Sequence, residues 1–130
     1  MLTVTLRVQS DTDRVTAYEA TFTHPEGKHS RGRLVTLIRG ENSLNLKARH
    51  GRDLTDDETG RLLKLLAEAT IKPLSSHAVG RGGTFYMLKI ERGFNAATFT
   101  WWNSLPAAWR ALSEMVERLV DYGAVENTGN

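Results

Sequence analysis

The stretch TFYMLKIERGFNAATFTWW, residues 84–102, decides the fold, because two apolar runs flank a short turn. Residues 84–91 and 96–102 are rich in aromatic and aliphatic side chains and predict two strands, with residues 92–95 as the turn. A two-residue turn at 93–94 and a four-residue turn at 92–95 have the same centre, so both give one register. The stretch therefore predicts an antiparallel hairpin with defined cross-strand pairs.

The two faces of this hairpin differ in character. The pairs on one face are all apolar and predict the core side of the sheet: Tyr86 with Trp101, Leu88 with Phe99, and Ile90 with Ala97. On the other face Phe85 is expected opposite Trp102, beside Met87. Two interpretations of that aromatic pair stay open, because such pairs stabilise sheets and also form interaction sites on exposed faces.

Four further strands are predicted before this hairpin. Alternating apolar residues indicate strands at 2–8, 14–23 and 44–49, and residues 33–39 are apolar on both faces, which is typical of a central strand. Pairing Leu6 with Tyr18 requires an odd number of residues between the first two strands, so we expect a bulge or a five-residue turn there.

Two helices are predicted from capping and periodicity. Thr55 followed by Glu58 makes a capping box for a helix that runs to about residue 69, and Gly60 within it suggests a close packing contact. A second helix is expected to start near Ser104 and Pro106 and to stop at Gly123, with Trp109 on its buried face. The order ββββ-α-ββ-α predicts an α+β fold: an antiparallel sheet of about six strands with two helices on one face. We expect a single domain over residues 1–123 and a flexible tail over 124–130.

Composition narrows the classes of function. The chain of 130 residues has no cysteine, which excludes disulfide scaffolds, Cys-ligated zinc and thiol catalysis. No apolar run approaches the roughly 20 residues of a membrane span, and no signal peptide is evident, so we expect a cytoplasmic protein. The net charge is only +2, but residues 28–33 (KHSRGR) and 47–52 (KARHGR) are locally basic and are expected to be solvated loops or a patch for an acidic partner or phosphate.

No motif indicates catalysis, a cofactor or a metal. The four histidines fall in predicted loops, and none has a second ligand at helical spacing. The GRGG run at 80–83 precedes a strand, so it does not present a helix N-terminus to phosphate. We therefore predict no enzymatic activity, no cofactor and no metal. The lowest-ranked alternative is a small enzyme that uses His29, His50 or His77 with neighbouring arginines.

A resemblance extends over residues 82–119, which cover under a third of the chain. This segment resembles small bacterial α+β proteins that share a Gly-x-x-Tyr-x-Leu-x-Ile strand, an aromatic-x-Trp strand and a Pro-x-x-Trp-x-x-Leu helix. Some of those proteins resemble immunity proteins of interbacterial toxin systems. The matching residues are Tyr86, Leu88, Ile90, Phe99, Trp101, Pro106, Trp109 and Leu112. All of them have core roles, so the resemblance implies a shared fold, and immunity proteins act by binding rather than by catalysis.

The first functional hypothesis is a non-enzymatic protein-binding module, specifically an immunity protein that binds a toxin domain. Its predicted contacts are Phe85, Met87, Trp102, Arg31, Arg33, Arg49 and Arg52. The alternative is a single-stranded nucleic-acid-binding module that uses the same aromatic pair and basic loops. A homodimer through the exposed sheet face is a further expectation, and no membrane partner is predicted.

Overall fold

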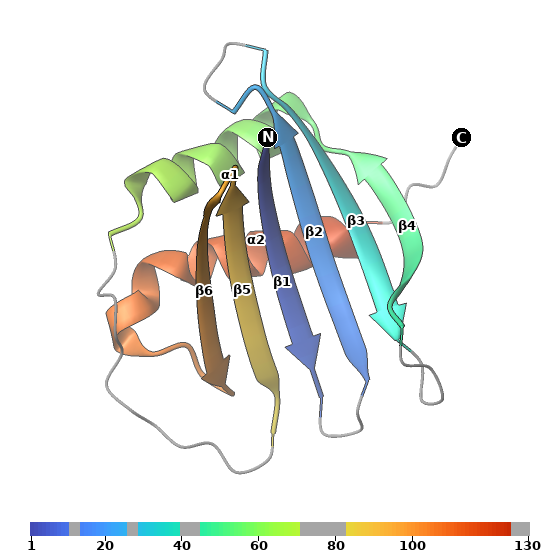
Figure 1. The fold of residues 1–130 in the computed structure, drawn as a ribbon, viewed down its shortest axis with the longest axis vertical. Coiled ribbons are helices and arrows are strands. Elements are labelled where there is room, and N and C mark those ends of the chain that lie inside the picture. Colours follow the sequence, from blue (N-terminus) through green and yellow to red (C-terminus); the bar gives the residue numbers. More distant parts are fainter. Residues whose placement is uncertain (11–13, 26–28, 40–44, 71–82, 126–130) are drawn as a thin grey trace.

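The computed structural model describes residues 1–10, 14–25, 29–39, 45–70 and 83–125. It contains one six-stranded antiparallel sheet in the order β4-β3-β2-β1-β5-β6. Both described helices lie on the same face of this sheet, and none of the described helices lies on the opposite face (Figure 1). The elements are β1 (Leu2–Gln9), β2 (Val15–Thr23), β3 (Arg31–Arg39), β4 (Lys47–Asp53), α1 (Asp56–Glu68), β5 (Phe85–Arg92), β6 (Asn95–Trp102), a 3-10 helix η1 (Ala107–Leu112) and α2 (Ser113–Ala124). The predicted α+β fold is confirmed.

The β5–β6 hairpin has the predicted register. Phe85 pairs with Trp102, and the remaining pairs follow in step to Arg92 with Asn95. The turn is the two-residue form, and Gly93 occupies its first central position with φ 57°, where a side chain would be strained. Glycine at this position is typical of a type II′ turn, whose twist matches that of the flanking strands.

The β1–β2 hairpin also has the predicted register. Leu6 pairs with Tyr18 and Gln9 pairs with Val15, so residues 10–14 form the connection. This odd number of connecting residues is what the pattern required, and the Ser10 amide donates to the Arg14 carbonyl at 3.0 Å. Residues 11–13 lie outside the described residues. β3 lies inside the sheet, as predicted, whereas the pairing of β1 with β5 was not predictable from the pattern alone.

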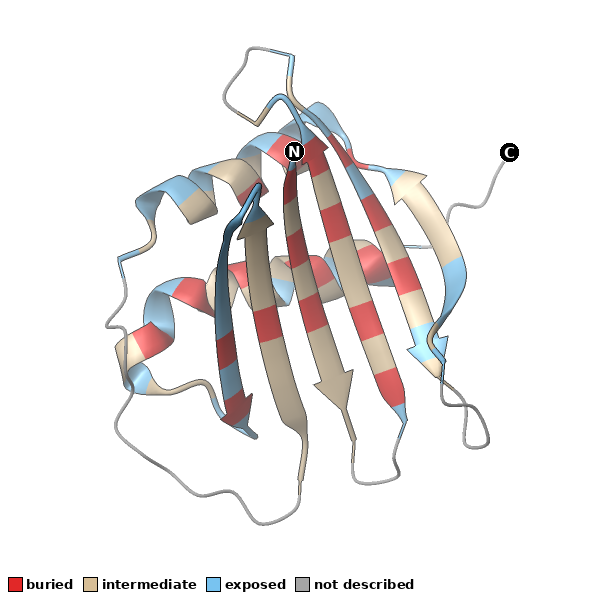
Figure 2. Cartoon of the chain, viewed as in Figure 1, coloured by how far each residue is buried: buried red, intermediate tan, exposed pale blue. Residues whose placement is uncertain are grey.

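The core lies between the sheet and the two helices. Val4, Leu6 and Leu88 are fully buried on the sheet side, and Leu62 and Leu119 are fully buried on the helix side. Buried residues alternate with less buried ones along β1 and β3 (Figure 2). This alternation is what a sheet with one covered face requires. Along β2 the buried positions change face between Ala17 and Ala20.

Helix α1 begins as predicted. The Thr55 hydroxyl accepts from the Glu58 amide at 3.1 Å, and the Glu58 carboxylate accepts from the Thr55 amide at 3.0 Å, which completes the capping box. The expected close contact at Gly60 is wrong, because a Cβ there would meet nothing within 4 Å.

The second helical segment begins close to the predicted position, at Ala107 after Pro106, but its form and its end differ from the prediction. It starts as the 3-10 helix η1 and bends at Trp109, whose φ of −111° is not helical, before α2 begins. Gly123 does not stop the helix, which runs to Ala124. Instead Gly123 is buried against Tyr18 and Thr36, where a Cβ would overlap the tyrosine ring. Residues 126–130 of the predicted tail lie outside the described residues.

The fourth strand was predicted at residues 44–49, which is too early in the chain. The structure places it at Lys47–Asp53, so the basic run KARHGR is a strand and not a loop, and His50 lies in that strand. The register shifts between Thr36 and Leu37, which leaves Arg49 unpaired as a bulge. The apolar alternation at 44–49 was misleading because the strand is held by backbone pairing and by contacts of its polar side chains.

Candidate functional site

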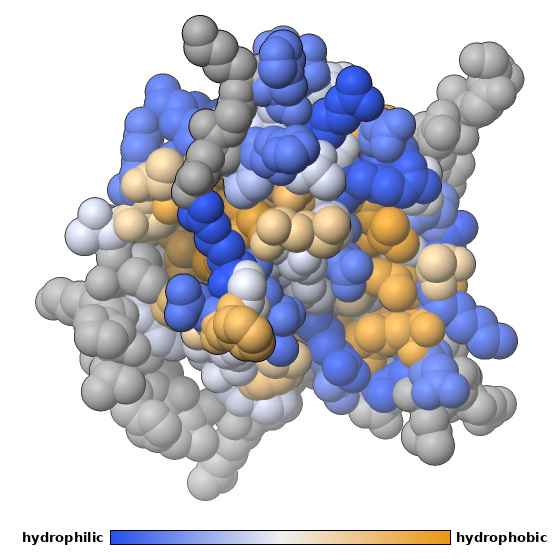
Figure 3. Space-filling model, turned by 45° about the horizontal axis from the view of Figure 1, so that its top comes forward, coloured by the Kyte–Doolittle hydropathy of each residue, from blue (hydrophilic) through white to orange (hydrophobic). Residues whose placement is uncertain are grey.

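The candidate site lies on the face of the sheet that no described helix covers. In β5 and β6 this face carries the partners Phe85 and Trp102. In β3 it carries Arg31 and Arg33, because the intervening Gly32 faces the helices. The space-filling view shows separate apolar areas bordered by hydrophilic side chains on the part of the surface that faces the viewer (Figure 3).

The aromatic corner of this face consists of Phe85, Met87 and Trp102. The Phe85 and Trp102 ring centroids are 5.0 Å apart and their planes are inclined by 55°. Trp102 is 40% exposed, whereas Phe85 and Met87 are half-buried. The two rings stabilise each other as a cross-strand pair, and the large side chain of Trp102 still remains in contact with solvent.

The other two tryptophans belong to the core, as predicted. Trp101 stacks on Tyr86 with centroids 5.4 Å apart and planes inclined by only 6°. Trp109 meets Trp101 and Phe99 edge-on, at 6.5 Å and 5.3 Å. Both tryptophans are less than a tenth exposed, so Trp102 is the tryptophan available to a partner.

Beside the aromatic corner the uncovered face continues with Arg7, whereas the next position along β1 on this face is polar, with Thr5 between Lys89 and Glu19. Arg7 lies between Met87 on β5 and Ala17 on β2. Ala17 and Val15 are 2% and 1% exposed although no described helix covers them. Within the described residues the Arg7 guanidinium makes no hydrogen bond or ion pair. Its half-buried aliphatic stem extends the apolar surface from the aromatic corner toward β2.

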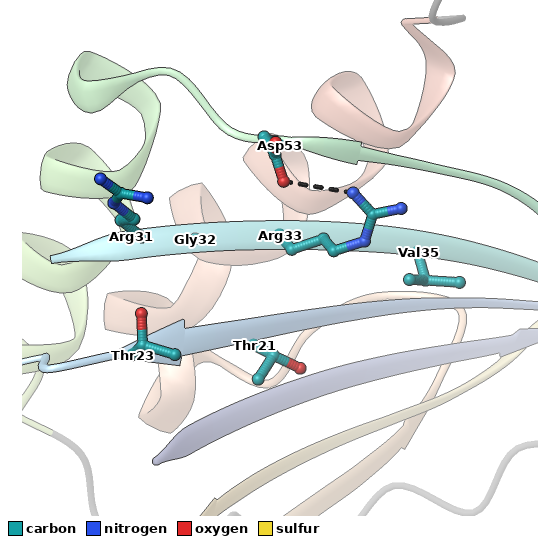
Figure 4. A pocket seen from close by; sticks show the side chains of 7 residues that line it. All are labelled: Thr21, Thr23, Arg31, Gly32, Arg33, Val35 and Asp53. Atoms are coloured by element: carbon teal, nitrogen blue, oxygen red, sulfur yellow. Dashed lines mark hydrogen bonds and ion pairs between the residues drawn. The ribbon is translucent and has the colours of Figure 1, made fainter.

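The basic corner is a shallow depression of about 380 Å³ (Figure 4). Its lining residues come from three neighbouring strands: Thr21, Thr23, Arg31, Gly32, Arg33, Val35 and Asp53. Arg33 donates to Asp53 at 3.1 Å, but the two side chains are 56% and 87% exposed, so this pair is weak. Gly51 leaves space for the Arg33 guanidinium, since a Cβ there would lie 3.0 Å from it.

The two corners are separate surfaces on one face. Phe85 pairs with Gln9 of β1. Arg33 pairs with Thr21 of β2, and Thr21 in turn pairs with Thr3 of β1. The positions of Gln9 and Thr3 on β1 place the corners about 20 Å apart along the strands, and the intervening strands add about 14 Å across the sheet. The predicted aromatic and arginine contacts are thus on one face but not in one pocket.

The remaining two predicted contacts occupy other positions. Arg49 is exposed in the β4 bulge. Arg52 faces the helices, where its guanidinium binds both carboxylate oxygens of Glu58 at 2.8 Å and donates to the Tyr122 carbonyl at 3.0 Å. The hydrogen bonds between the two side chains raise the pKa of Arg52 and lower the pKa of Glu58 to about 2. Arg52 therefore joins β4 to the start of α1 and the end of α2.

The histidines do not form a common site in the described part of the chain. His50 Nε2 lies 3.0 Å from the Gly123 carbonyl at the end of α2, His24 and His29 are exposed, and His77 lies outside the described residues. Among the described residues no group of three His, Cys, Asp or Glu side chains is placed to hold a metal ion. No helix in the described ranges has the length and apolar character needed to cross a membrane.

Sequence reasoning missed two contributors to the uncovered face and one exposed apolar residue in the β5–β6 turn. Thr21 and Asp53 flank Arg33 in the basic corner, and only the strand order, which brings β2, β3 and β4 together, reveals this. Phe94 at the tip of the β5–β6 turn is fully exposed. An apolar residue at a turn position of a hairpin is a signal of exposure that the sequence itself carries.

Comparison of the sequence with protein-family models and with curated proteins found no match.

Proposed function

We propose that this chain is a non-enzymatic protein-binding module whose uncovered sheet face contacts a partner, and that the partner is a toxin domain that the chain neutralises. The observation that carries the proposal is the exposed Trp102 beside Phe85 on a face that no described helix covers. The narrower role as an immunity protein rests on the resemblance of residues 82–119.

The aromatic corner has the properties of an interface centre. Tryptophan is enriched among residues that dominate binding energy, because it buries a large apolar area at low conformational cost. Phe85 fixes the orientation of the Trp102 ring before binding, since the two centroids are already 5.0 Å apart. A partner that covers this corner would therefore gain apolar contact without first ordering the side chains.

The basic corner supplies a different kind of contact. Arg31 makes no hydrogen bond or ion pair with described residues, and Arg33 holds Asp53 only in an exposed pair. Acidic side chains of a partner are the groups that would bind there. Such peripheral charges set orientation and association rate more than affinity.

The geometry favours a protein over single-stranded nucleic acid. Stacking of bases needs accessible ring faces, but Phe85 and Trp102 pack against each other at an inclination of 55°. The predicted basic contacts also lie apart from the aromatic pair, because Arg31 and Arg33 occupy the opposite corner of the face and Arg7 is the arginine beside Met87. Low dependence of binding on salt is therefore expected.

The test is binding of the purified full chain to the toxin domain encoded next to its gene, measured by calorimetry. The variant Phe85→Ser with Trp102→Ser is expected to weaken binding by about 100-fold, because it removes the interface centre. Phe94→Ser is the matched control, since it removes an equally apolar exposed side chain from the far end of the same hairpin.

Two results would contradict the proposal. In the first, the double variant binds the toxin domain as tightly as the natural chain does, whereas Phe94→Ser weakens binding. The other is a double variant that unfolds, shown by loss of its circular dichroism, because the aromatic pair would then be required for the fold. A gene neighbourhood without any toxin would remove the immunity role and leave the protein-binding proposal to be tested on other partners.

A further inference from the structure

We propose that the outer edge of β6 is a docking site for an extended, uncharged segment of a partner protein, which adds to the sheet as a seventh strand. This inference rests on the proposed protein-binding function but concerns a different surface from the aromatic corner. It concerns the backbone of Ala96, Thr98 and Thr100 rather than the side chains of the uncovered face.

The hydrogen-bond pattern of the hairpin identifies which backbone groups point outward. The Asn103 amide donates to the Thr84 carbonyl at 2.8 Å, which continues the β5–β6 register by one pair. In antiparallel pairs, bonded and non-bonded positions alternate. Odd-numbered residues of β6 therefore bond to β5, and the amides and carbonyls of Ala96, Thr98 and Thr100 point away from it. No described strand lies on that side.

The two edges of the sheet differ in their protection against pairing. β4 is irregular because of its bulge, and its sequence KARHGRD is dominated by charged and ionisable residues. β6 has the sequence NAATFTWW, which contains no charged residue and no proline, and its first four residues are all exposed. Natural sheets protect edge strands with charges, prolines or bulges. The described part of β6 carries none of these, so its edge is open to pairing.

The helix layer argues for a single added strand rather than a second copy of the chain. The later part of α1 and the segment of η1 and early α2 extend beyond β6 on the helix side (Figure 1). A second copy paired edge to edge would bring its own helices into that space. An extended segment has no helix layer and fits beside β6 without this conflict.

The side chains of β6 define the chemistry of the segment. On the helix side β6 presents Ala97 and Phe99, whereas on the uncovered side it presents Thr98 and Thr100. A matching strand alternates apolar residues with small polar ones. A charged residue opposite β6 would find no countercharge on this strand, which is why the segment is expected to be uncharged.

The experiment follows amide hydrogen exchange of the full ¹⁵N-labelled chain by NMR, with a capped peptide of alternating threonine and valine as the probe. Exchange at Ala96, Thr98 and Thr100 is expected to slow about tenfold when the peptide is added, as the gain of one to two backbone hydrogen bonds implies. The same peptide with an N-methylated central residue is the matched probe, and it should give little protection.

A variant tests the same point from the protein side. Thr98→Pro removes an outward amide without removing a bond to β5, and proline is tolerated at such edge positions. It is expected to abolish protection, whereas Thr98→Val keeps it. If Thr98→Pro fails to fold, the comparison of the unmodified and N-methylated peptides on the natural chain still tests whether a strand pairs with β6.

Three results would overturn the inference: no protection, equal protection by both peptides, or protection that rises with protein concentration in the absence of peptide. The last would identify a second copy as the occupant. Because the peptide does not need the aromatic corner, Phe85→Ser should leave edge protection unchanged. Failure at the edge is thereby distinguished from failure of the proposed sheet-face function.

Discussion

At the scale of single residues, Arg52 shows how structure assigns roles that composition cannot. In the sequence it belongs to a basic run that is typical of a solvated patch. In the structure its side chain is only 11% exposed and connects Glu58 with the Tyr122 carbonyl. A planar guanidinium can bind a carboxylate with two parallel hydrogen bonds and still reach a third acceptor, which a lysine cannot do.

Replacing Arg52 by lysine is therefore expected to lower the free energy of unfolding by about 1–3 kcal/mol. The loss comes from the bidentate contact with Glu58 and from the Tyr122 carbonyl, which loses its donor. Urea denaturation measures the change. Arg49→Lys, in the exposed bulge of the same strand, should stay within about 0.5 kcal/mol of the natural chain. Equal effects of the two substitutions would show that Arg52 does not hold the helices.

At the scale of elements, local signals determined some features and tertiary contacts determined others. The capping box at Thr55 and the register of the β5–β6 hairpin were predictable because each depends on residues close in sequence. The bounds of β4 and the end of α2 were not, because β4 pairs with β3 and Gly123 packs on Tyr18, far away in the chain. Both elements contain polar or glycine residues whose structural role depends on contacts with residues far away in the sequence.

The two helix glycines give opposite predictions. Gly60→Ala in α1 is expected to stabilise the fold by about 0.5–1 kcal/mol, since alanine favours the helix and meets no neighbour. Gly123→Ala in α2 is expected to destabilise it by about 1–3 kcal/mol, because the new methyl overlaps the Tyr18 ring. Thermal unfolding of both variants measures the two signs. A stabilising Gly123→Ala would contradict the close contact.

The candidate site was predictable to a similar extent. Phe85, Met87 and Trp102 could be grouped because the hairpin register follows from one turn. The arginines could not be placed, because their faces depend on the bulge in β4 and on the strand order. Thus Arg31 and Arg33 share the uncovered face, whereas Arg52 faces the helices.

At the scale of the whole molecule, β1 lies between β2 and β5 and joins the first four strands to the final hairpin. On the covered face the two helices pack against each other, and Arg61 of α1 forms an ion pair with Glu114 of α2. Hydrogen bonds to Arg61 lower the pKa of Glu114, as those to Arg52 lower the pKa of Glu58. Global stability should therefore depend on these carboxylates remaining ionised.

The sign of this dependence follows from the lowered pKa of Glu58. Its pKa falls from 4.5 to about 2, so its contribution is complete above about pH 4.5 and is lost as the pH falls toward 2. The expected loss is about 1–2 kcal/mol, because solvent weakens part of the interaction. Urea denaturation across this pH range measures it. Glu58→Gln should flatten the dependence and Glu117→Gln, on the exposed side of α2, should not; identical curves would contradict this assignment.

The position of β1 also has a consequence during biosynthesis. When the ribosome has released only the first four strands, β1 can pair with β2 but lacks its second neighbour, because β5 is encoded much later. The apolar side of β1, with Val4 and Leu6, is then uncovered as well. Such an intermediate exposes both a strand edge and core residues, which favours aggregation. Nascent chains stalled before residue 85 are therefore expected to be recognised by chaperones, and those stalled beyond α2 are not.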